Sequence, residues 1–544
     1  MKNRKIKYTS KIALMAIGSM MLSFSVEAQM NPKVKLQEAL KLIQENYVDP
    51  VHDEKLVDVA IKAMVGDLDP HSNYISREDA EAMNQSMSGS FAGIGITFAM
   101  VNDSTFVTDV NPDGPAMRAG LRQGDCILRV DHQQITGKNL KNQQVMMMLR
   151  GEKGKEVSLM VLHPGAAEPV TVKVTREQIA SFSIRSSYMV NKEIGYISLG
   201  IFSESTRREM DTALKDLKAQ GMKKLILDLQ GNGGGYVQSA IGVADEFLPK
   251  ESLVFYSVGH DGGKDHYATG GFGQFMTGDL VVLIDESTAS SSEIVTGSLQ
   301  DWDRAVVIGR RSFGKGLMQK PVVMTDGSVL QLTGARYYTP SGRSIQKPYV
   351  KGKADYFEDF NRRLASGELK EPGHLNFPDS LKFSTLINKK TVYGGGGIMP
   401  DRFVPIDTNV YSGWMNAIMS SGIATKAGFV HVQQHRAELL KQYPDFAAFN
   451  ARFQVDDVMI DQILDQASAR FKGLPAKSDQ TARKSLKVEM KADMATLLYA
   501  GRDFQLRVRN EANEAFLAAV DVLKDQSQYN RLLRGNGLQR KKGK

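Results

Sequence analysis

Ser290 lies in a serine-rich cluster, and a glycine-flanked lysine, Lys315, follows the next apolar run of the chain. The apolar, β-branched run 280–284 precedes the serines; it is too short for an independent helix and predicts a buried strand of a parallel sheet. A second strand is expected over 305–308, before the loop that carries the lysine. A serine needs a base to become a nucleophile, and a lysine held neutral can serve. The pattern therefore indicates nucleophilic catalysis by a serine and a lysine.

This region resembles the carboxyl-terminal processing proteases, also called tail-specific proteases. The turn reads S-T-A-S-S-S-E over 287–293, the lysine lies in F-G-K-G over 313–316, and Gln319 follows four residues after the lysine. The resemblance implies that Ser290 is the nucleophile, Lys315 its general base and Gln319 the group that orients the lysine. On the pattern alone, a strand, a loop and a helix with a serine N-cap and a surface lysine remains the alternative.

A glycine-rich loop, D-L-Q-G-N-G-G-G over 228–235, follows another predicted strand and precedes a helix. Such a loop could hold a phosphate, but it lacks the lysine and the Ser/Thr of a P-loop and the spacing of a dinucleotide site. It resembles the family's D-L-R-G-N-P-G-G, which implies that Gly233 and Gly234, with the N–H of Ser291, form the oxyanion hole. The chain departs from that motif at Gln230, where the family has arginine, and at Gly233, where it has proline.

The expected mechanism follows from these parts. Ser290 attacks a peptide carbonyl while neutral Lys315 takes its proton, and water then hydrolyses the acyl-enzyme. A lysine titrates near ~10.4, so it must be desolvated or placed near positive charge to act as a base near neutral pH. Gln319 would fix the direction of the amine. Asp301 matches an aspartate of the family and is expected to support the site structurally. We expect neither a cofactor nor a metal ion.

Residues 89–176 resemble a PDZ domain. Four residues open its predicted peptide-binding strand: Gly93, Ile94, Gly95 and Ile96. In such domains an extended peptide adds to a sheet edge while backbone amides hold its terminal carboxylate, so the predicted partners are protein substrates recognised through their C-termini. Arg150 lies where the family has an arginine that is thought to couple this domain to the active site. The alternative is a small β-rich domain that only packs on the enzyme.

The beginning of the chain predicts export. Basic residues precede an apolar run over 12–26 that ends in V-E-A, which is typical of a signal peptide spanning 1–28 and cleaved after Ala28. We therefore expect a periplasmic protein, with membrane association if the segment is not cleaved. Residues 1–28 carry five basic and one acidic side chain, so their removal lowers the formal net charge from +8 to +4. This modest charge does not favour nucleic acid as a partner.

The 544 residues are too many for one core. We expect an N-terminal helical region over 30–88, the inserted PDZ domain, a protease core over 178–403, and a C-terminal helical domain over 404–544. Apolar runs alternate with helical patterns in the core, which predicts an α/β fold with parallel strands. The resemblance implies a core related to the crotonase and Clp-protease architecture. His71 follows Asp-Pro and is predicted to be a turn residue.

Two further features favour structural roles. His431 and His435 have a spacing that could bind a metal on a helix, but no H-E-x-x-H motif and no third ligand accompany them. Cys126 is the single cysteine, so it forms no intramolecular disulfide and is expected to pack in the core. The C-terminal helices could mediate homo-oligomerisation or hold an adaptor or regulatory protein.

The sequence therefore predicts an exported serine endopeptidase that recognises protein tails through its PDZ domain and cuts with a Ser–Lys dyad. A catalytically silent PDZ adaptor is the alternative from another class of protein. The joint presence of Ser290, Lys315 and Gln319 argues against it, because a silent scaffold has no physical need for all three. A hydrolase of non-peptide substrates could use the same dyad, but the PDZ domain disfavours that interpretation.

Overall fold

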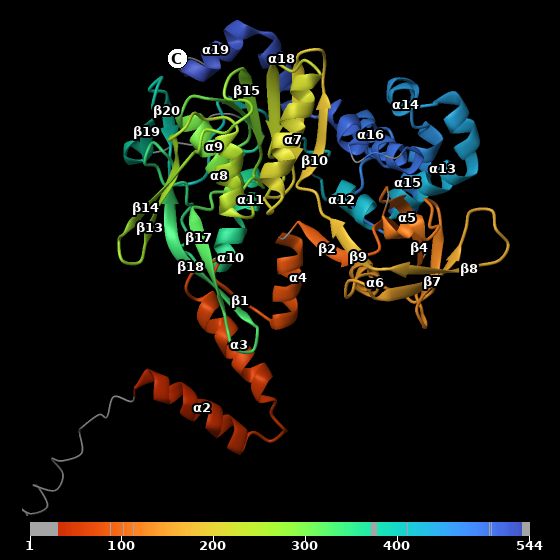
Figure 1. The fold of residues 1–544 in the computed structure, drawn as a ribbon, viewed down its shortest axis with the longest axis horizontal. Helices are drawn as coiled ribbons and strands as arrows, with labels where there is room; N and C mark the ends of the chain where they lie inside the picture. Colours follow the sequence, from red (N-terminus) through yellow and green to blue (C-terminus); the bar gives the residue numbers. More distant parts are fainter. Residues whose placement is uncertain are drawn as a thin grey trace, which may run out of the picture. The chain divides into compact units, whose positions relative to one another are not determined.

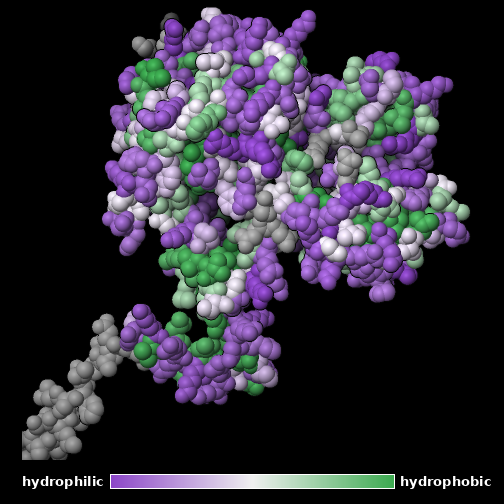
Figure 2. All heavy atoms as spheres, viewed as in Figure 1, coloured by the Kyte–Doolittle hydropathy of each residue, from purple (hydrophilic) through white to green (hydrophobic). Residues whose placement is uncertain are grey.

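The computed structural model describes residues 31–535 except 88, 102, 113, 372–377, 411, 500 and 502, so the predicted signal peptide lies outside the described residues. The chain divides into two compact units, 1–65 and 66–544. In the first unit, helix α2 (Pro32–Asn46) is capped by Asn31, whose side chain accepts a hydrogen bond from the Lys33 N–H at 3.0 Å. Helix α3 (Asp53–Gly66) follows and ends at the boundary of the two units. Helix α2 buries no side chain, and Figure 2 shows apolar side chains on the surface of this unit.

In the second unit, the PDZ region is an antiparallel sheet with strand order β3-β4-β5-β7-β8 (Figure 1). Its elements are β3 (Ile96–Val101), β4 (Ser104–Val110), α5 (Pro115–Arg118), β5 (Cys126–Val130), β6 (Gln133–Gln134), α6 (Asn142–Leu149), β7 (Glu156–Leu162) and β8 (Val170–Thr175). Strand β2 (Ser90–Gly93) pairs with β9 (Glu177–Ala180) where the chain enters and leaves this region. Alternate strand residues such as Val157, Leu159 and Val161 are fully buried, as expected of a half-covered sheet.

The core contains a larger sheet with strand order β10-β11-β12-β15-β16-β21. The strands are β10 (Ile184–Met189), β11 (Ile194–Leu199), β12 (Lys224–Asp228), β15 (Asp279–Ile284), β16 (Val306–Gly309) and β21 (Arg402–Phe403). From β11 to β21 they are parallel. Leu225 and Leu227 face one apolar layer and Ile226 faces the other. Helices cover both faces, so the strands read as continuous apolar runs rather than alternating ones.

Helices from distant parts of the sequence form these two layers. One layer contains α7 (Thr206–Ala219), α8 (Val237–Asp245) and α9 (Ser291–Asp301). The other contains α18 (Glu514–Lys524) and α19 (Gln526–Arg534), near the end of the chain. In Figure 1 the blue helices α18 and α19 lie beside the green strands of the sheet. The last described helices thus complete the α/β core.

A second core sheet carries the lysine loop. Its order is β1-β18-β13-β14, with β17 also paired to β18, and all of these pairings are antiparallel. Its strands are β1 (Asn73–Ile75), β13 (Leu253–Gly259), β14 (Lys264–Ala268), β17 (Leu317–Val323) and β18 (Val329–Tyr338). The remaining core elements are α4 (Arg77–Met87), α10 (Lys353–Phe357), α11 (Asp359–Ala365), η1 (Asp379–Leu381), β19 (Lys382–Ser384) and β20 (Thr391–Tyr393).

A separate group of helices packs against the PDZ sheet. It contains α12 (Gly413–Ser420), α13 (Ile423–Gln442), α14 (Phe446–Arg452), α15 (Asp457–Ser468), α16 (Gln480–Leu498) and α17 (Phe504–Asn510). The rings of Phe106 on β4 and Phe429 on α13 lie 4.6 Å apart, and Gln123 donates to the Thr496 carbonyl at 2.9 Å. Cys126 on β5 of the PDZ sheet is buried, as expected.

Among the described helices, no segment has the length and apolar character needed to cross a bilayer.

Candidate active site

Ser290 lies at a sharp turn between β15 and α9. Its backbone has φ 56° and ψ −118°, a conformation that costs strain for a residue with a Cβ atom. The turn is shaped by Asp285, whose carboxylate accepts hydrogen bonds from the N–H groups of Ser287 and Thr288 at 3.0 Å each. Ser290 is half-buried, whereas the two serines after it are buried. A strained strand-to-helix turn is how α/β-hydrolases expose a nucleophilic serine, and it distinguishes Ser290 from its neighbours.

Glu293 joins the serine turn to the lysine loop. Its fully buried carboxylate accepts hydrogen bonds from the N–H groups of Ser290 at 2.9 Å, Gly314 at 2.7 Å and Lys315 at 2.8 Å. The Ser312 hydroxyl donates to it at 2.5 Å. Burial raises the pKa of Glu293, and these four hydrogen bonds oppose that rise. One carboxylate therefore fixes the backbones of both candidate catalytic residues.

Tyr337 on β18 forms hydrogen bonds with the backbone carbonyl groups of the same two residues. Its hydroxyl donates to the Lys315 carbonyl at 2.8 Å and to the Ser290 carbonyl at 3.3 Å. The side chain is buried, and burial raises its pKa well above the ordinary value, so the hydroxyl keeps its proton at neutral pH. Neither Glu293 nor Tyr337 is predicted as a site residue by the sequence, in which Glu293 is only part of the serine motif.

The glycines around Lys315 allow close backbone packing. A Cβ atom on Gly314 would lie 3.0 Å from the Gly397 N, and one on Gly316 would lie 3.0 Å from the Gln346 N. Burial lowers the pKa of Lys315, and the carboxylates of Glu293 and Asp69 act against that shift. The net direction is the one that a lysine base needs.

Gln319 and Asp301 both have polar partners in or after strand β18. Gln319 is on β17, and its amide donates to the Thr333 hydroxyl at 3.4 Å. Asp301, at the end of α9, forms a fully buried ion pair of 2.7 Å with Arg343 and accepts the Ser341 N–H at 2.9 Å. Asp301 thus holds the segment after β18, while Gln319 is bonded to Thr333 on β18.

The glycine loop after β12 packs against the serine turn. A Cβ atom on Gly234 would lie 2.8 Å from the Ser290 Cβ and 3.0 Å from the Ser291 N. The Gly234 N–H donates to the Asn232 side chain at 2.8 Å, so this predicted oxyanion donor is engaged within the loop. Among the described residues, the N–H groups of Gly233 and Ser291 have no hydrogen-bond acceptor.

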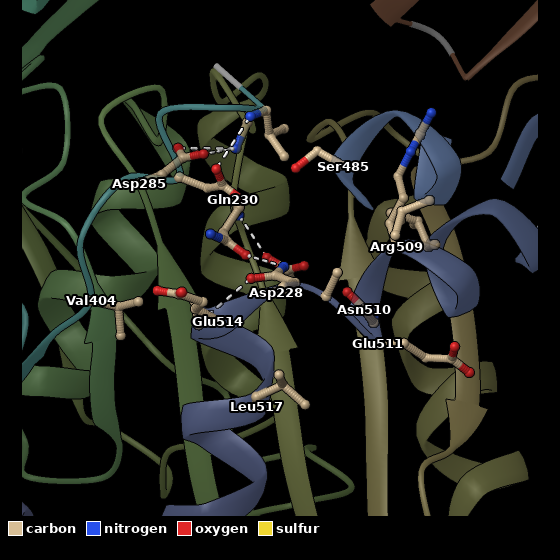
Figure 3. Close-up of a pocket in the computed structure, with 18 of the residues that line it drawn as sticks. Asp228, Gln230, Asp285, Val404, Ser485, Arg509, Asn510, Glu511, Glu514 and Leu517 are labelled. Carbon is tan, nitrogen blue, oxygen red and sulfur yellow. Dashed lines mark hydrogen bonds between the residues drawn. The ribbon is translucent and has the colours of Figure 1, made fainter. Parts of the chain in front are cut away.

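The other side of the glycine loop faces a pocket of about 540 Å³ lined by the core and the C-terminal helices (Figure 3). The Gln230 side chain accepts a hydrogen bond from Asn513 at 3.0 Å, and Arg185 donates to the Gln230 carbonyl at 2.9 Å. Asp228, at the end of β12, is buried, which raises its pKa to about 6. The position where the family has arginine is therefore held by contacts from β10 and from the residue before α18.

The predicted PDZ residues lie at the start of an edge strand. Gly93 ends β2, Ile96 begins β3, and the Ile94 carbonyl between them accepts the Ala116 N–H at 3.0 Å. Gly95 has φ +76°, a region that favours glycine. Among the described strands, β3 pairs with β4 alone, so its other edge has no strand partner.

Three other predicted positions are also placed. Arg150 is the residue that follows α6. Its guanidinium carbon lies 4.2 Å from the centre of the Phe91 ring on β2. His431 and His435 lie on α13 with their rings 4.9 Å apart. Within the described part of the chain, no three His, Cys, Asp or Glu side chains gather as they would around a metal ion.

His71 has a larger part in the site than its predicted turn position indicated. Its Nε2 lies 2.9 Å from the Tyr356 hydroxyl, and its ring makes an edge contact with Phe313, with centroids 6.4 Å apart. Burial, with a further contribution from Lys315, lowers the pKa of His71 to about 4, so the ring is neutral at neutral pH. The sequence signal is the short Asp-Pro-His-Ser motif, which by itself does not indicate proximity to Lys315.

Family models match four parts of the chain. Residues 193–354 match peptidase family S41 and residues 92–174 match the PDZ domain. Residues 16–79 match the N-terminal domain of the activating protease CtpB, and residues 414–501 match a family of unknown function. These matches confirm the predicted α/β peptidase core with a PDZ domain and helical N- and C-terminal regions.

Two named relatives are similar to more than half of the chain. A carboxy-terminal-processing protease of Bartonella bacilliformis is 38% identical over 314 residues, 56% of this chain and 70% of the relative. The carboxy-terminal processing protease CtpB of Bacillus subtilis is 31% identical over 346 residues, 62% of this chain and 70% of the relative. The solved structure of a photosystem II D1 C-terminal processing protease is 28% identical to this chain, with a TM-score of 0.33. The match covers 57% of this chain and 89% of the solved chain. The chain belongs to the carboxy-terminal processing proteases of peptidase family S41.

Proposed function

We propose that this chain is an exported endopeptidase that captures protein C-termini with its PDZ domain and cuts them with Ser290 and Lys315. The observation that carries the proposal is the joint fixation of these two residues. Glu293 accepts the N–H of each, and the Tyr337 hydroxyl donates to the carbonyl of each. Residues held in this way lose little freedom when a substrate binds, which favours reaction.

In the proposed reaction, the Ser290 hydroxyl adds to the peptide carbonyl while its proton moves to the neutral Lys315 amine. Burial favours the neutral amine. The N–H groups of Gly233 and Ser291 are the oxyanion donors that the loop geometry favours, because the Gly234 N–H already donates to Asn232. The lysine then returns the proton to the leaving amine, and water releases the acyl group. Gln319 is proposed to orient the lysine with Thr333 as its neighbour.

The substrate tail is proposed to pair with the open edge of β3, with its terminal carboxylate at the amides of the loop Gly93–Ile96. Arg150, which lies on Phe91 of β2, is proposed to connect occupation of this loop to the protease core. Export is proposed from residues 1–28, whose removal leaves the mature chain.

The test compares mature protein, Ser290→Ala, Lys315→Ala and the surface control Lys320→Ala on an unfolded protein with an apolar C-terminus. We expect each site variant to lower kcat at least about a thousandfold and Lys320→Ala to match the parent. An amidated tail should raise KM. Tail binding by all variants without cleavage by the parent would support the adaptor instead, and full cleavage by Lys315→Ala would exclude the dyad.

A further inference from the structure

Residues Asp69–Ser72 form a turn built around one carboxylate. Asp69 Oδ1 accepts the N–H groups of His71 at 2.8 Å and Ser72 at 2.9 Å, and the Ser72 hydroxyl donates to Oδ2 at 2.5 Å. Ser72 is buried. The turn has a defined shape and leads directly into β1, which pairs with β18 of the lysine-bearing sheet.

One side of this turn braces the lysine loop. His71 Nε2 lies 2.9 Å from the Tyr356 hydroxyl, which also accepts a hydrogen bond from the Gln346 amide at 3.3 Å. The Gln346 side-chain oxygen in turn accepts the Gly316 N–H at 2.7 Å. A chain of hydrogen bonds thus runs from His71 to the residue after Lys315.

The other side of the turn braces the predicted orienting group. The Ser72 hydroxyl accepts the Thr333 N–H at 3.0 Å, and the Thr333 hydroxyl accepts the Gln319 amide at 3.4 Å. Ser72 also contacts the Thr333 hydroxyl at 3.5 Å. The same short turn therefore contacts the surroundings of both Lys315 and Gln319.

The charges around Lys315 are unequal. The negative charges of Glu293 on α9 and Asp69 in the turn both oppose the lowering of the Lys315 pKa by burial. Glu293 is engaged with four donors, whereas Asp69 is bonded within its own turn and interacts with the Thr333 side chain. Other titratable groups lie around the lysine loop: neutral His71 in the turn, Tyr337 on β18, Tyr356 on α10, Lys347 with its partner Asp359, Lys353, which acts on His71, and Arg363, which donates to the Ser312 carbonyl.

We propose that Asp69, His71 and Ser72 are positioning residues for the Lys315 base: His71 and Ser72 hold the lysine loop and Gln319, and the Asp69 carboxylate supplies the counter-charge for the ammonium formed when Lys315 takes the Ser290 proton. The inference rests on the proposed dyad. When the ammonium returns its proton to the leaving amine, the carboxylate is again without a partner charge, and no proton passes to Asp69 itself.

The first test is the pH profile of kcat/KM for full mature protein and Asp69→Asn. Asparagine keeps an oxygen acceptor for the turn and removes the charge. The acid limb reports the pKa of the free base, and an opposite charge raises a lysine pKa. We expect the limb to move about one unit to lower pH and the plateau to fall about tenfold, because the ammonium loses its counter-charge.

The matched control is Asp326→Asn. Asp326 forms a similar turn between β17 and β18, where it accepts the Ser328 N–H at 2.9 Å and the Ser328 hydroxyl at 2.7 Å. This control should keep the parent's limb and plateau. If Asp69→Asn unfolds and binds tails like the parent and the acid limb of its pH profile does not move, Asp69 does not supply the counter-charge.

The second test removes a brace without changing charge. Ser72→Ala should lower kcat about tenfold with the acid limb in place, through loss of the hydrogen bonds between the turn and Thr333, while Ser328→Ala should match the parent. Parent-like kcat in Ser72→Ala overturns the bracing role, and this variant decides alone if Asp69→Asn does not fold. Full activity of Lys315→Ala removes the dyad and this inference together. If Lys315→Ala is inactive and Asp69→Asn behaves like the parent, only the proposed counter-charge role of Asp69 is excluded.

Discussion

The candidate active site and the PDZ domain use backbone N–H groups in opposite ways. In the active site, the amides of Ser290, Gly314 and Lys315 already bond to one buried carboxylate, Glu293. In the PDZ domain, one edge of β3 has no partner among the described strands. A reaction centre gains from groups that are fixed before the substrate arrives, whereas an edge strand binds by leaving its groups to be paired by the peptide. Substitutions should therefore separate cutting from capture.

The largest separation is expected from Glu293→Gln. Glutamine has one acceptor oxygen, so at least two of the four donors that face Glu293 lose their partner in a buried site. We expect kcat to fall about a hundredfold or more, unfolding free energy to fall by about 3 kcal/mol, and tail-peptide affinity to stay at the parent's value. Kinetics, denaturant unfolding and fluorescence anisotropy measure these quantities. Exposed Glu204→Gln is the control, and unchanged kcat in Glu293→Gln contradicts the role of the carboxylate.

Tyr337→Phe is expected to act in the same direction with a smaller effect. It removes one hydroxyl that donates to Lys315 and Ser290 and leaves the ring packing in place. We expect about a tenfold loss in kcat and about 1–2 kcal/mol less stability, because buried carbonyl groups lose a donor. The adjacent Tyr338→Phe serves as control. Equal kinetics for the two variants would show that the hydroxyl is not needed.

Gly95→Ala tests peptide binding by the PDZ domain. A Cβ atom there would lie 3.2 Å from the Ile179 side chain, on a backbone with φ +76°. We expect the Kd for a tail peptide to rise about tenfold, equal to the loss of roughly one hydrogen bond, with kcat on a short amidated peptide unchanged. Gly120→Ala has a similar φ, +95°, and open space around it, so equal weakening in that control would indicate domain strain rather than a displaced binding loop.

The smallest effect is expected at the back of the glycine loop. Asn513→Asp keeps the side-chain oxygen that caps α18 but removes the donor to Gln230. We expect kcat to fall about two- to threefold through a looser oxyanion loop, with unfolding free energy unchanged within about 0.5 kcal/mol. A larger loss of stability than of kcat would assign Asn513 to the fold rather than to the loop.

Local patterns were sufficient for much of this organisation. The apolar run 280–284 predicted strand β15, and the motif over 287–293 placed Ser290 at a strand-to-helix turn. The comparisons confirm the family and the PDZ domain. Such features are predictable because a strand, a turn and a helix are encoded by neighbouring residues. The roles of Ser290, Lys315, Gln319 and the oxyanion donors stay predictions until tested.

The sequence by itself determined the family, the serine turn and the glycine-flanked lysine, since each depends on short contiguous motifs. Only the tertiary structure decided what surrounds them. His71 meets Tyr356 across 285 residues and Ser72 meets Thr333 across 261 residues, and α18 and α19 cover the core sheet from the end of the chain. No local periodicity encodes such contacts, because they depend on which faces of distant elements are buried against one another.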